Sequence, residues 1–465
     1  MKKYLFIFLF ISSSVFGQHF GFNGAGFFEN YDAQTIKWLH DWNQPFTIRI
    51  PGGAISKFHD PYNNRKGWGM TEANVKNWFN TSGFDEDGQG LDKWLRKTEE
   101  QPDHSFMDDL INLQKEFPNM QVIYVLNILN STPEANMTAL RYMIKGGVKI
   151  VGVEAGNEVY GKYNSFDEYV KDFEPVFKIV KKEFPQIKTA ICVAPIKGIK
   201  EKDFWNQQMS KYKGDYDAAI VHFYYTGKEM KDVYSSMPEN VVADENKINN
   251  SLDKVYRLAI NTLMENKLFT YHIEESKRLF PGKAIWITEW NTKPSDVFNN
   301  TILNGAWQMK SLIDYRNDVE YLCIHNGVGP DKYGMISRTN KFDSEKTALV
   351  RRMGYWAYQL AGEAGNAIEL KKDKTYIVSF SDEENVCYYF YNFGETYKTN
   401  IQYAENNTIA TIHYVSGKYI YSSSGTAGYM GKGTKASYEV NGIIAEKFSS
   451  TIPKNSFGYI EFQKK

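Results

Sequence analysis

The sequence carries no excess charge of either sign, because 55 basic and 55 acidic side chains give a formal net charge of zero over 465 residues. The charges are spread along the chain, with no basic stripe of the kind that binds nucleic acid and no acidic tail. Apolar runs are short too. Beyond the amino terminus, none approaches the roughly twenty apolar residues of a membrane-spanning helix. We therefore expect no nucleic-acid partner and no membrane span.

Cysteine is scarce. The three cysteines, Cys192, Cys323 and Cys387, lie apart from one another in apolar, strand-like runs, and we interpret them as buried free thiols rather than a disulfide. The sequence also lacks a CxxC pair, an HExxH motif and any cluster of His and Cys at metal-ligand spacing. The run Gly24-Ala25-Gly26 lacks the third glycine of a dinucleotide-binding turn. We therefore predict neither a catalytic metal nor a cofactor.

The amino terminus has the pattern of a secretory signal. Lys2 and Lys3 precede an apolar run from Tyr4 to Ile11, and small residues follow up to Gly17. A basic start, a short apolar core and a small residue before the cut are typical of a cleavable signal peptide. We predict a signal peptide over residues 1–17 and a secreted or periplasmic mature protein.

Apolar segments rich in β-branched and aromatic residues recur along the first three quarters of the chain, with amphipathic helix-like stretches between them. Eight such segments are predicted as strands: Phe20–Asn23, Phe46–Ile50, Gln121–Asn127, Lys149–Ala155, Lys188–Ala194, Ala218–Tyr224, Ala284–Glu289 and Glu320–Asn326. Strands that alternate with helices imply a parallel sheet, and eight such units fit a (β/α)8 TIM barrel. A doubly wound sheet is the alternative.

After about Ala364 the pattern changes to closely spaced strands punctuated by Gly and Ser. The predicted strands here are Thr375–Phe380, Val386–Asn392, Thr408–Tyr414, Tyr419–Ser422, Ala436–Val440 and Ser456–Phe462. This arrangement is typical of an antiparallel sandwich. We predict a (β/α)8 barrel over residues 18–363, followed by a small C-terminal antiparallel β-sandwich over residues 364–465.

Two glutamates stand at the ends of predicted barrel strands. Glu158 ends the fourth strand within Glu154-Ala-Gly-Asn157-Glu158, and Glu289 ends the seventh within Ile-Thr-Glu289-Trp290-Asn. Barrel enzymes place their catalytic groups at the carboxyl ends of the strands. Two carboxylates at that end are what glycoside cleavage requires, because one must give a proton and the other must attack or activate water.

These motifs resemble the large clan of (β/α)8-barrel retaining glycoside hydrolases often called clan A. The closest forms are those of its arabinofuranosidase, β-xylosidase and β-glucuronidase-like branches, which also carry a sandwich after the barrel. The resemblance implies that Glu158 is the acid/base and Glu289 the nucleophile. It also implies that Asn157 binds the 2-hydroxyl of the sugar. Glu154 is interpreted as a partner inside the barrel.

Two further segments fit this resemblance. His222 and Tyr224 end the sixth strand, where the clan often has a His and a Tyr, and the Tyr steadies the nucleophile. The run Arg49-Ile-Pro-Gly52-Gly53 resembles a turn of the arabinofuranosidase and xylosidase branch, in which the glycines let backbone approach the sugar. A cation at Arg49 is also expected to lower the pKa of the nucleophile.

Three other residues are candidates for sugar binding. Trp290 follows the second glutamate, while Asn127 and His325 end the third and eighth strands, and packing is the alternative role for these last two. Two long insertions, Ala54 to Pro118 and Gly227 to Gly282, are expected at the barrel mouth, where such segments shape substrate binding.

The sequence thus predicts a secreted retaining hydrolase of plant or algal poly- or oligosaccharide, with carbohydrate as its partner and no indication of oligomeric state. The alternative is an inactive barrel that binds polysaccharide. For the enzyme we expect the two carboxyl groups about 5–5.5 Å apart. We also expect the pKa of Glu158 to be raised by the nearby charge of Glu289.

Overall fold

The computed structural model describes residues 19–29, 31–42, 44–60, 62, 65–82, 89–196, 200–225, 256–292, 300–329, 334–337, 350–380, 385–403, 408–418, 429–430, 434–435 and 440–464. The predicted signal peptide at residues 1–17 lies outside these ranges. No helix within them is long and apolar enough to cross a membrane.

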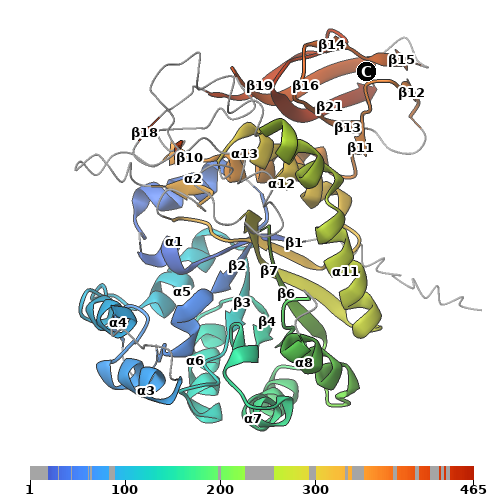
Figure 1. The fold of residues 1–465 in the computed structure, drawn as a ribbon. Helices are drawn as coiled ribbons and strands as arrows, with labels where there is room; N and C mark the ends of the chain where they lie inside the picture. The colour runs from blue at the N-terminus through green and yellow to red at the C-terminus, as the bar shows by residue number, and fades with distance from the viewer. Residues whose placement is uncertain are drawn as a thin grey trace, which may run out of the picture.

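Eight parallel strands close into a barrel in which each strand pairs with its sequence neighbours and the first pairs with the eighth (Figure 1). The strands are β1 (His19–Asn23), β2 (Thr47–Ile50), β3 (Gln121–Val125), β4 (Ile150–Glu154), β5 (Lys188–Cys192), β6 (Ala218–Tyr225), β7 (Ala284–Thr292) and β8 (Tyr321–Ile324). All eight predicted strands are confirmed. The doubly wound alternative is wrong, because the sheet has no open edge.

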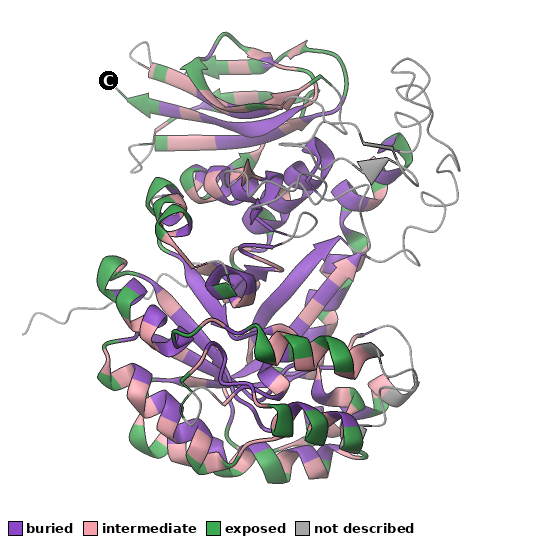
Figure 2. Ribbon diagram, turned by 90° about the vertical axis from the view of Figure 1, so that its left-hand side faces the viewer, coloured by how far each residue is buried: buried purple, intermediate pink, exposed green. Residues whose placement is uncertain are grey.

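Helices surround the barrel, and most of them combine buried with exposed positions (Figure 2). The helices are α1 (Ala25–Glu29), α2 (Ala33–Trp42), α3 (Glu72–Ser82), α4 (Gln89–Glu99), α5 (Phe106–Glu116), α6 (Pro133–Lys145), α7 (Phe166–Glu183), α8 (Lys200–Lys211), α11 (Lys267–Leu279), α12 (Ile302–Asp314) and α13 (Met353–Ala364). Two 3-10 turns, η1 (Gly53–Lys57) and η2 (Val159–Gly161), follow β2 and β4.

Helix α7 shows how local sequence sets these elements. Ser165 caps its amino end by accepting a hydrogen bond from the backbone N–H of Glu168. Buried residues then recur every three or four positions, as in Phe166, Tyr169 and Phe173, and the other positions are largely polar. This spacing aligns the apolar side chains on one face, which packs on the barrel.

The first predicted insertion, Ala54 to Pro118, is largely helical rather than an open loop. It contains η1, α3, α4 and α5, of which α5 immediately precedes β3. Trp68 is buried in the core, while Trp78 and Trp94 both pack edge-on against Phe58. In the second insertion, residues 256–265 and α11 are helical, and residues 226–255 lie outside the described part of the chain.

The carboxyl-terminal part forms a five-stranded sheet in the order β11-β13-β21-β16-β19, and three two-stranded pairs, β12-β15, β14-β20 and β17-β18, form separate small sheets. Their bounds are β11 (Ile368–Glu369), β12 (Thr375–Val378), β13 (Asn385–Asn392), β14 (Tyr397–Lys398), β15 (Asn400–Tyr403), β16 (Thr408–Gly417), β17 (Tyr429–Met430), β18 (Thr434–Lys435), β19 (Val440–Lys447), β20 (Thr451–Ile452) and β21 (Ser456–Lys464). A separate pair, β9 (Ile336–Ser337) and β10 (Val350–Arg351), precedes α13.

This sheet region has its own apolar core and matches the predicted sandwich. Phe390, Ile412, Ile460 and Phe462 are all buried within that core. Four of the six predicted strands are confirmed, with end-point shifts of a few residues. The predicted strand at residues 419–422 lies outside the described chain, and of 436–440 only Val440 is described, as the start of β19.

The sheet packs on α12 and α13, above the barrel in Figure 1. A side-chain carbon at Gly305 of α12 would lie 2.6 Å from Phe457 Cζ of β21, so the glycine allows this close approach. Tyr389 on β13 donates a hydrogen bond to Asp314 Oδ1 at the end of α12, at 2.6 Å. Helix α13 ends at Ala364, the point where the sequence pattern changes.

The cysteines are free thiols, as predicted. Cys192 and Cys323 are buried, as predicted, whereas Cys387 is partly exposed, so that the prediction of a buried thiol is wrong at that position. Burial raises the pKa of the Cys192 thiol to about 12, and the thiol donates to the carbonyl oxygen of Gly156 at 3.2 Å. A neutral thiol at this place packs as a small apolar group behind the loop that follows β4.

Candidate active site

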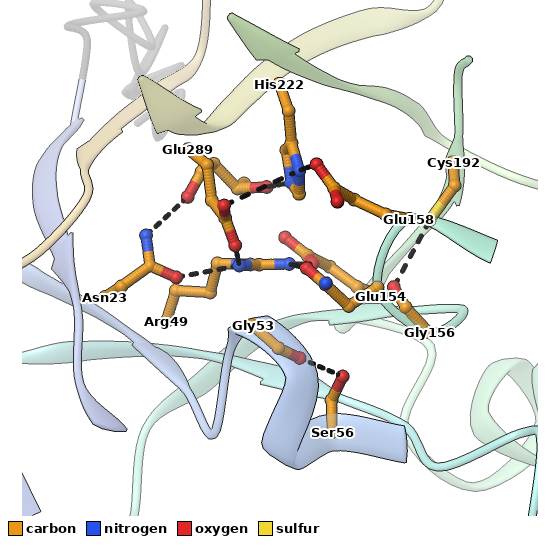
Figure 3. Close-up of polar contacts among 12 residues, drawn as sticks. Asn23, Arg49, Gly53, Ser56, Glu154, Gly156, Glu158, Cys192, His222 and Glu289 are labelled. Atoms are coloured by element: carbon orange, nitrogen blue, oxygen red, sulfur yellow. Dashed lines mark hydrogen bonds and ion pairs between the residues drawn. The ribbon is translucent and has the colours of Figure 1, made fainter. Parts of the chain in front are cut away.

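Arg49 on β2 lies at the centre of a buried polar network inside the barrel (Figure 3). Its Nη1 donates to Glu289 Oε1 and to Asn23 Oδ1, both at 2.7 Å. Its Nε donates to Glu154 Oε2 at 2.8 Å, and its Nη2 donates to Asn157 Oδ1 at 2.8 Å. The planar guanidinium has donors pointing in all these directions at once, which an ammonium group does not offer. Arg49 therefore ties together the ends of four strands.

Of the two glycines after β2, Gly52 makes room for this network. Gly52 has φ +68°, and a side-chain carbon there would lie 2.5 Å from Asn23 Oδ1 and 3.3 Å from Arg49 Nη1. Gly53 has φ +58° with open space beside it, and its carbonyl oxygen accepts from Ser56 Oγ at 2.7 Å. Both positions thus require the left-handed conformation that glycine adopts freely. Their predicted approach to the sugar stays a prediction.

Glu289 is held as a carboxylate from several sides. Its Oε2 accepts from the Tyr224 hydroxyl at 2.8 Å and lies 3.7 Å from His325 Nδ1. Burial alone would raise its pKa, but the charges of His222, His325 and Arg49 and the Tyr224 hydrogen bond outweigh burial and hold the pKa far below its ordinary value. This low pKa is the one expected of an ionised nucleophile.

An irregularity in β7 helps to aim Glu289. The pairing register with β6 shifts between Val221 and His222, so that His222 lies opposite Glu289, and the register with β8 shifts between Ile287 and Trp290. Such bulges redirect side chains and are frequent beside active sites. Glu289 consequently faces the barrel interior at the carboxyl end of the strand.

Glu158 occupies a special backbone position, with φ +48° and ψ +47° at the start of η2. The left-handed conformation is rare for residues other than glycine, and strain of this kind gathers at functional sites. Its Oε1 accepts from His222 Nδ1 at 3.0 Å, while His222 Nε2 lies 3.2 Å from Thr288 Oγ1. His222 therefore bridges the strand of one glutamate to the carboxyl of the other.

The sequence-based expectation of a raised Glu158 pKa is wrong for the unliganded protein. Burial does raise it, and so does the charge of Glu289, but the hydrogen bond and charge of His222 outweigh both and lower the pKa. The charge of Lys57 lowers it further. The expectation considered the like charge of Glu289 alone and overlooked the hydrogen bond from His222 on β6.

Glu158, His222 and Glu289 form one compact cluster, in which one carboxylate oxygen from each glutamate and one ring nitrogen lie within 4.8 Å of one another. These are also the described residues that would hold a metal ion if one bound. His222 donates to Glu158 and Tyr224 donates to Glu289, so that each carboxyl group has its own donor. Two carboxyl groups at this spacing can act on the two sides of a single bond.

The remaining predicted residues divide between site and scaffold. Asn157 is 4% exposed, and its bond from Arg49 fixes which end of its amide is the donor. His325 lies beside Glu289. The side chain of Asn127 is occupied by backbone groups, because its Nδ2 donates to the carbonyl of His59 and its Oδ1 accepts from the N–H of Asn130. A sugar-binding role for these residues stays a prediction.

The structure gives Trp290 a packing role, and its predicted contact with the sugar stays a prediction. Trp290 is fully buried, and its Nε1 donates to the Tyr358 hydroxyl on α13 at 3.0 Å. Its ring stacks on Phe269 of α11. Successive residues of a strand point to opposite faces, so that Glu289 faces the interior and Trp290 the surrounding helices.

Sequence reasoning missed three neighbours of the glutamates. Asn23 at the end of β1 accepts from Arg49, and its Nδ2 donates to the carbonyl oxygen of Thr288 at 2.8 Å. Tyr160, two residues past Glu158, has its pKa raised by burial and by the Glu158 charge. Lys57 of η1 interacts through its charge with both glutamates. A polar residue ending the first strand is a signal that could have revealed Asn23.

No protein-family model and no curated protein sequence matches the chain. Among solved structures, the α-L-arabinofuranosidase of Thermotoga maritima in its arabinose complex gives a TM-score of 0.57 at 16% identity, over 92% of this chain and 89% of that one. The GH51 arabinofuranosidase of Xanthomonas axonopodis pv. citri gives 0.57 at 15% identity, over 93% and 90%. A family 51 α-L-arabinofuranosidase of Bifidobacterium longum gives 0.57 at 11%, over 96% and 95%. These likenesses confirm the fold that the strand-end motifs predicted.

Proposed function

We propose that this chain is a secreted glycoside hydrolase that cleaves with retention of configuration, with Glu289 as nucleophile and Glu158 as acid/base. The observation that carries the proposal is the pair of carboxylates at the carboxyl ends of β4 and β7, with oxygens within 4.8 Å of each other. Retaining enzymes hold their carboxyl groups about 5–5.5 Å apart, whereas inverting enzymes leave about 6.5–9.5 Å for a water.

In the first step the Glu289 carboxylate attacks the anomeric carbon while the bond to the leaving oxygen breaks, and Glu158 gives its proton to that oxygen. The product is a glycosyl ester on Glu289. In the second step Glu158 takes a proton from water, the water oxygen attacks the anomeric carbon, and the Glu289 carboxylate is released. Arg49 and Tyr224 keep Glu289 ionised for the attack.

Substrate binding favours the protonated form of Glu158 that the first step requires. The side chain of Glu158 is 39% exposed in the free protein, whereas that of Glu289 is 7% exposed. A sugar seated over Glu158 removes its remaining water, and desolvation favours the protonated carboxyl. Substrate binding thus raises the pKa of the acid and leaves the buried nucleophile ionised.

The substrate class we propose is a plant or algal poly- or oligosaccharide. Because the three solved structures with a TM-score of 0.57 described above are arabinofuranosidases, an α-L-arabinofuranoside is the first compound to test. The experiment is hydrolysis of a panel of nitrophenyl glycosides and polysaccharides, with the anomeric form of the first product followed by proton NMR. Hydrolysis with retention is expected. Hydrolysis with inversion contradicts the roles proposed for Glu158 and Glu289, and polysaccharide binding without any hydrolysis favours the inactive binding protein.

A further inference from the structure

Two lysine side chains lie over one tryptophan ring near the candidate catalytic pair. Lys57 Nζ is 5.5 Å and Lys162 Nζ is 4.8 Å from the ring centroid of Trp78 on α3. Lys57 ends η1, directly after β2, and Lys162 follows η2, four residues past Glu158. The two ammonium groups thus reach the same ring from the segments that follow β2 and β4.

The charge of Lys57 affects the pKa of Lys162, and Lys57 also interacts with the two glutamates. Burial, and then the charge of Lys57, lower the pKa of Lys162 to about 8. Burial lowers the pKa of Lys57, while the charges of Glu158 and Glu289 act to raise it. Two like charges brought together by the fold repel each other, and an anion placed between them removes that cost.

Other contacts hold the Trp78 ring and the backbone of Lys57 in place. Asn77, beside Trp78, donates to Asn130 Oδ1 at 3.0 Å, and Asn130 Nδ2 donates to the carbonyl oxygen of Lys57 at 2.7 Å. Phe58 packs edge-on against the Trp78 ring. The ring and the backbone of Lys57 therefore have a fixed relation, and preorganisation of this kind favours ligand binding.

Within the described residues, no carboxylate forms an ion pair with Lys57 Nζ, which interacts only at longer range with the two glutamates. A third lysine lies near the residues that follow Glu158, since Lys202 Nζ is 5.4 Å from the ring centroid of Tyr160. The neighbourhood of the acid/base consequently carries three lysine side chains.

We propose that Lys57 and Lys162, on the Trp78 ring, form a subsite for an anionic substituent of the sugar chain, either the carboxylate of a uronate or a sulfate ester. The subsite deepens the glycosidase proposal and rests on it. The ring holds both ammonium groups by cation–π contact, and each lysine supplies a point charge for the anion. The enzyme then selects acidic over neutral saccharides.

The test measures binding without turnover, on the full mature chain carrying Glu289→Gln. The ligands are oligogalacturonate and a sulfated galactan oligosaccharide, each compared by calorimetry with its carboxyl-reduced or desulfated counterpart. At least one acidic ligand is expected to bind about tenfold tighter than its neutral counterpart, since tenfold corresponds to one well-placed charge pair. The ligand that shows the preference identifies the source of the anion.

Two variants, Lys57→Met and Lys162→Met, remove one charge each with little change of length. Each is expected to lower the acidic-to-neutral binding ratio, and the double variant to bring it close to one. The matched control is Lys171→Met, an exposed position on α7, which should leave the ratio unchanged.

The proposal is overturned if no acidic ligand binds better than its neutral counterpart, or if the two lysine variants weaken both ligands equally. Because these measurements use the Glu289→Gln protein, they do not depend on hydrolysis. Hydrolysis of neutral glycosides together with no acidic preference rejects the subsite alone. Acidic preference without hydrolysis by the unmodified chain rejects the enzyme and leaves an acidic-saccharide binding site.

Discussion

Arg49 on β2 donates a hydrogen bond from Nη1 to Glu289 Oε1 on β7 at 2.7 Å, inside the closed barrel. The Arg49 side chain is wholly buried, and the Glu289 side chain is 7% exposed. The same guanidinium also pairs with Glu154. A buried cation shared by two carboxylates couples the stability of the barrel to the ionisation of the proposed nucleophile.

Arg49→Met is expected to destabilise the protein by about 3–5 kcal/mol at neutral pH, because it leaves buried carboxylates without their cation. Arg49→Lys keeps the charge but loses the fork of donors, so that it should restore only part of the loss. Urea denaturation measures the free energy of unfolding of both variants. A loss below about 1 kcal/mol for Arg49→Met, the size found for exposed pairs, contradicts the buried network.

The loss of stability caused by Arg49→Met should depend on pH in a definite direction. The pKa of Glu289 is lowered in the folded protein, so that its ionised form stabilises the native state above the pKa of an unfolded Glu, about 4.3. That contribution is lost as pH falls toward the folded pKa. The difference in stability between the unmodified protein and Arg49→Met should therefore shrink below about pH 4.

Tyr224→Phe removes one hydrogen bond to Glu289 and little volume. Without that donor the pKa of Glu289 should rise, and the acid limb of the pH profile of kcat/KM should move upward. Tyr225→Phe is the matched control, since its hydroxyl contacts Asn266 at 3.2 Å on the outer side of the strand. If both variants move the acid limb alike, Tyr224 has no special role.

His222→Phe tests the cause of the lowered Glu158 pKa. His222 lowers the pKa of that carboxyl in the free protein, so that its removal should raise the pKa and extend the alkaline limb of kcat/KM to higher pH. The acid limb should move upward as well, because His222 also lowers the pKa of Glu289. The two titrations are coupled and are reported as apparent values of the pair. An alkaline limb that stays in place contradicts the assignment.

Glu158→Ala should lose about a hundredfold or more of its rate on substrates with poor leaving groups, the range that general acids contribute. The loss should be smallest on activated nitrophenyl glycosides, which leave without a proton. Azide should partly restore the variant by attacking the glycosyl-enzyme. Equal losses on all leaving groups argue against Glu158 as the acid.

Local sequence was sufficient for most of the barrel. The eight strands are marked by apolar β-branched and aromatic runs, and the two glutamates and Arg49 stand where those runs end. Because the carboxyl ends of parallel strands meet at one end of a barrel, the grouping of these residues follows from topology alone. Neither the assignment of the strands nor the grouping of these residues required the strand angles or the pairing register of the sheet.

Side-chain direction could not be predicted in the same way. Trp290 adjoins Glu289 in sequence but faces the helices, and the register shifts in β7 that aim the two side chains have no pattern in the sequence. The hydrogen bond from His222 to Glu158 joins residues 64 positions apart, so that its effect on the pKa depends on a distance that spacing does not give. Asn23 was missed although it ends the first predicted strand, because its contacts with Arg49 and Thr288 join residues far apart in the sequence.

The most direct test of the central claim is the site of covalent labelling. A 2-deoxy-2-fluoro glycoside with a good leaving group, built on whichever sugar the hydrolysis panel identifies, should accumulate as a glycosyl-enzyme, because fluorine slows the second step. Peptide mapping by mass spectrometry should then place one sugar on Glu289, and Glu289→Gln should remain unlabelled. A label on Glu158 or on another residue, or an active enzyme that never accumulates a label and releases the inverted product, contradicts the roles proposed for the two glutamates.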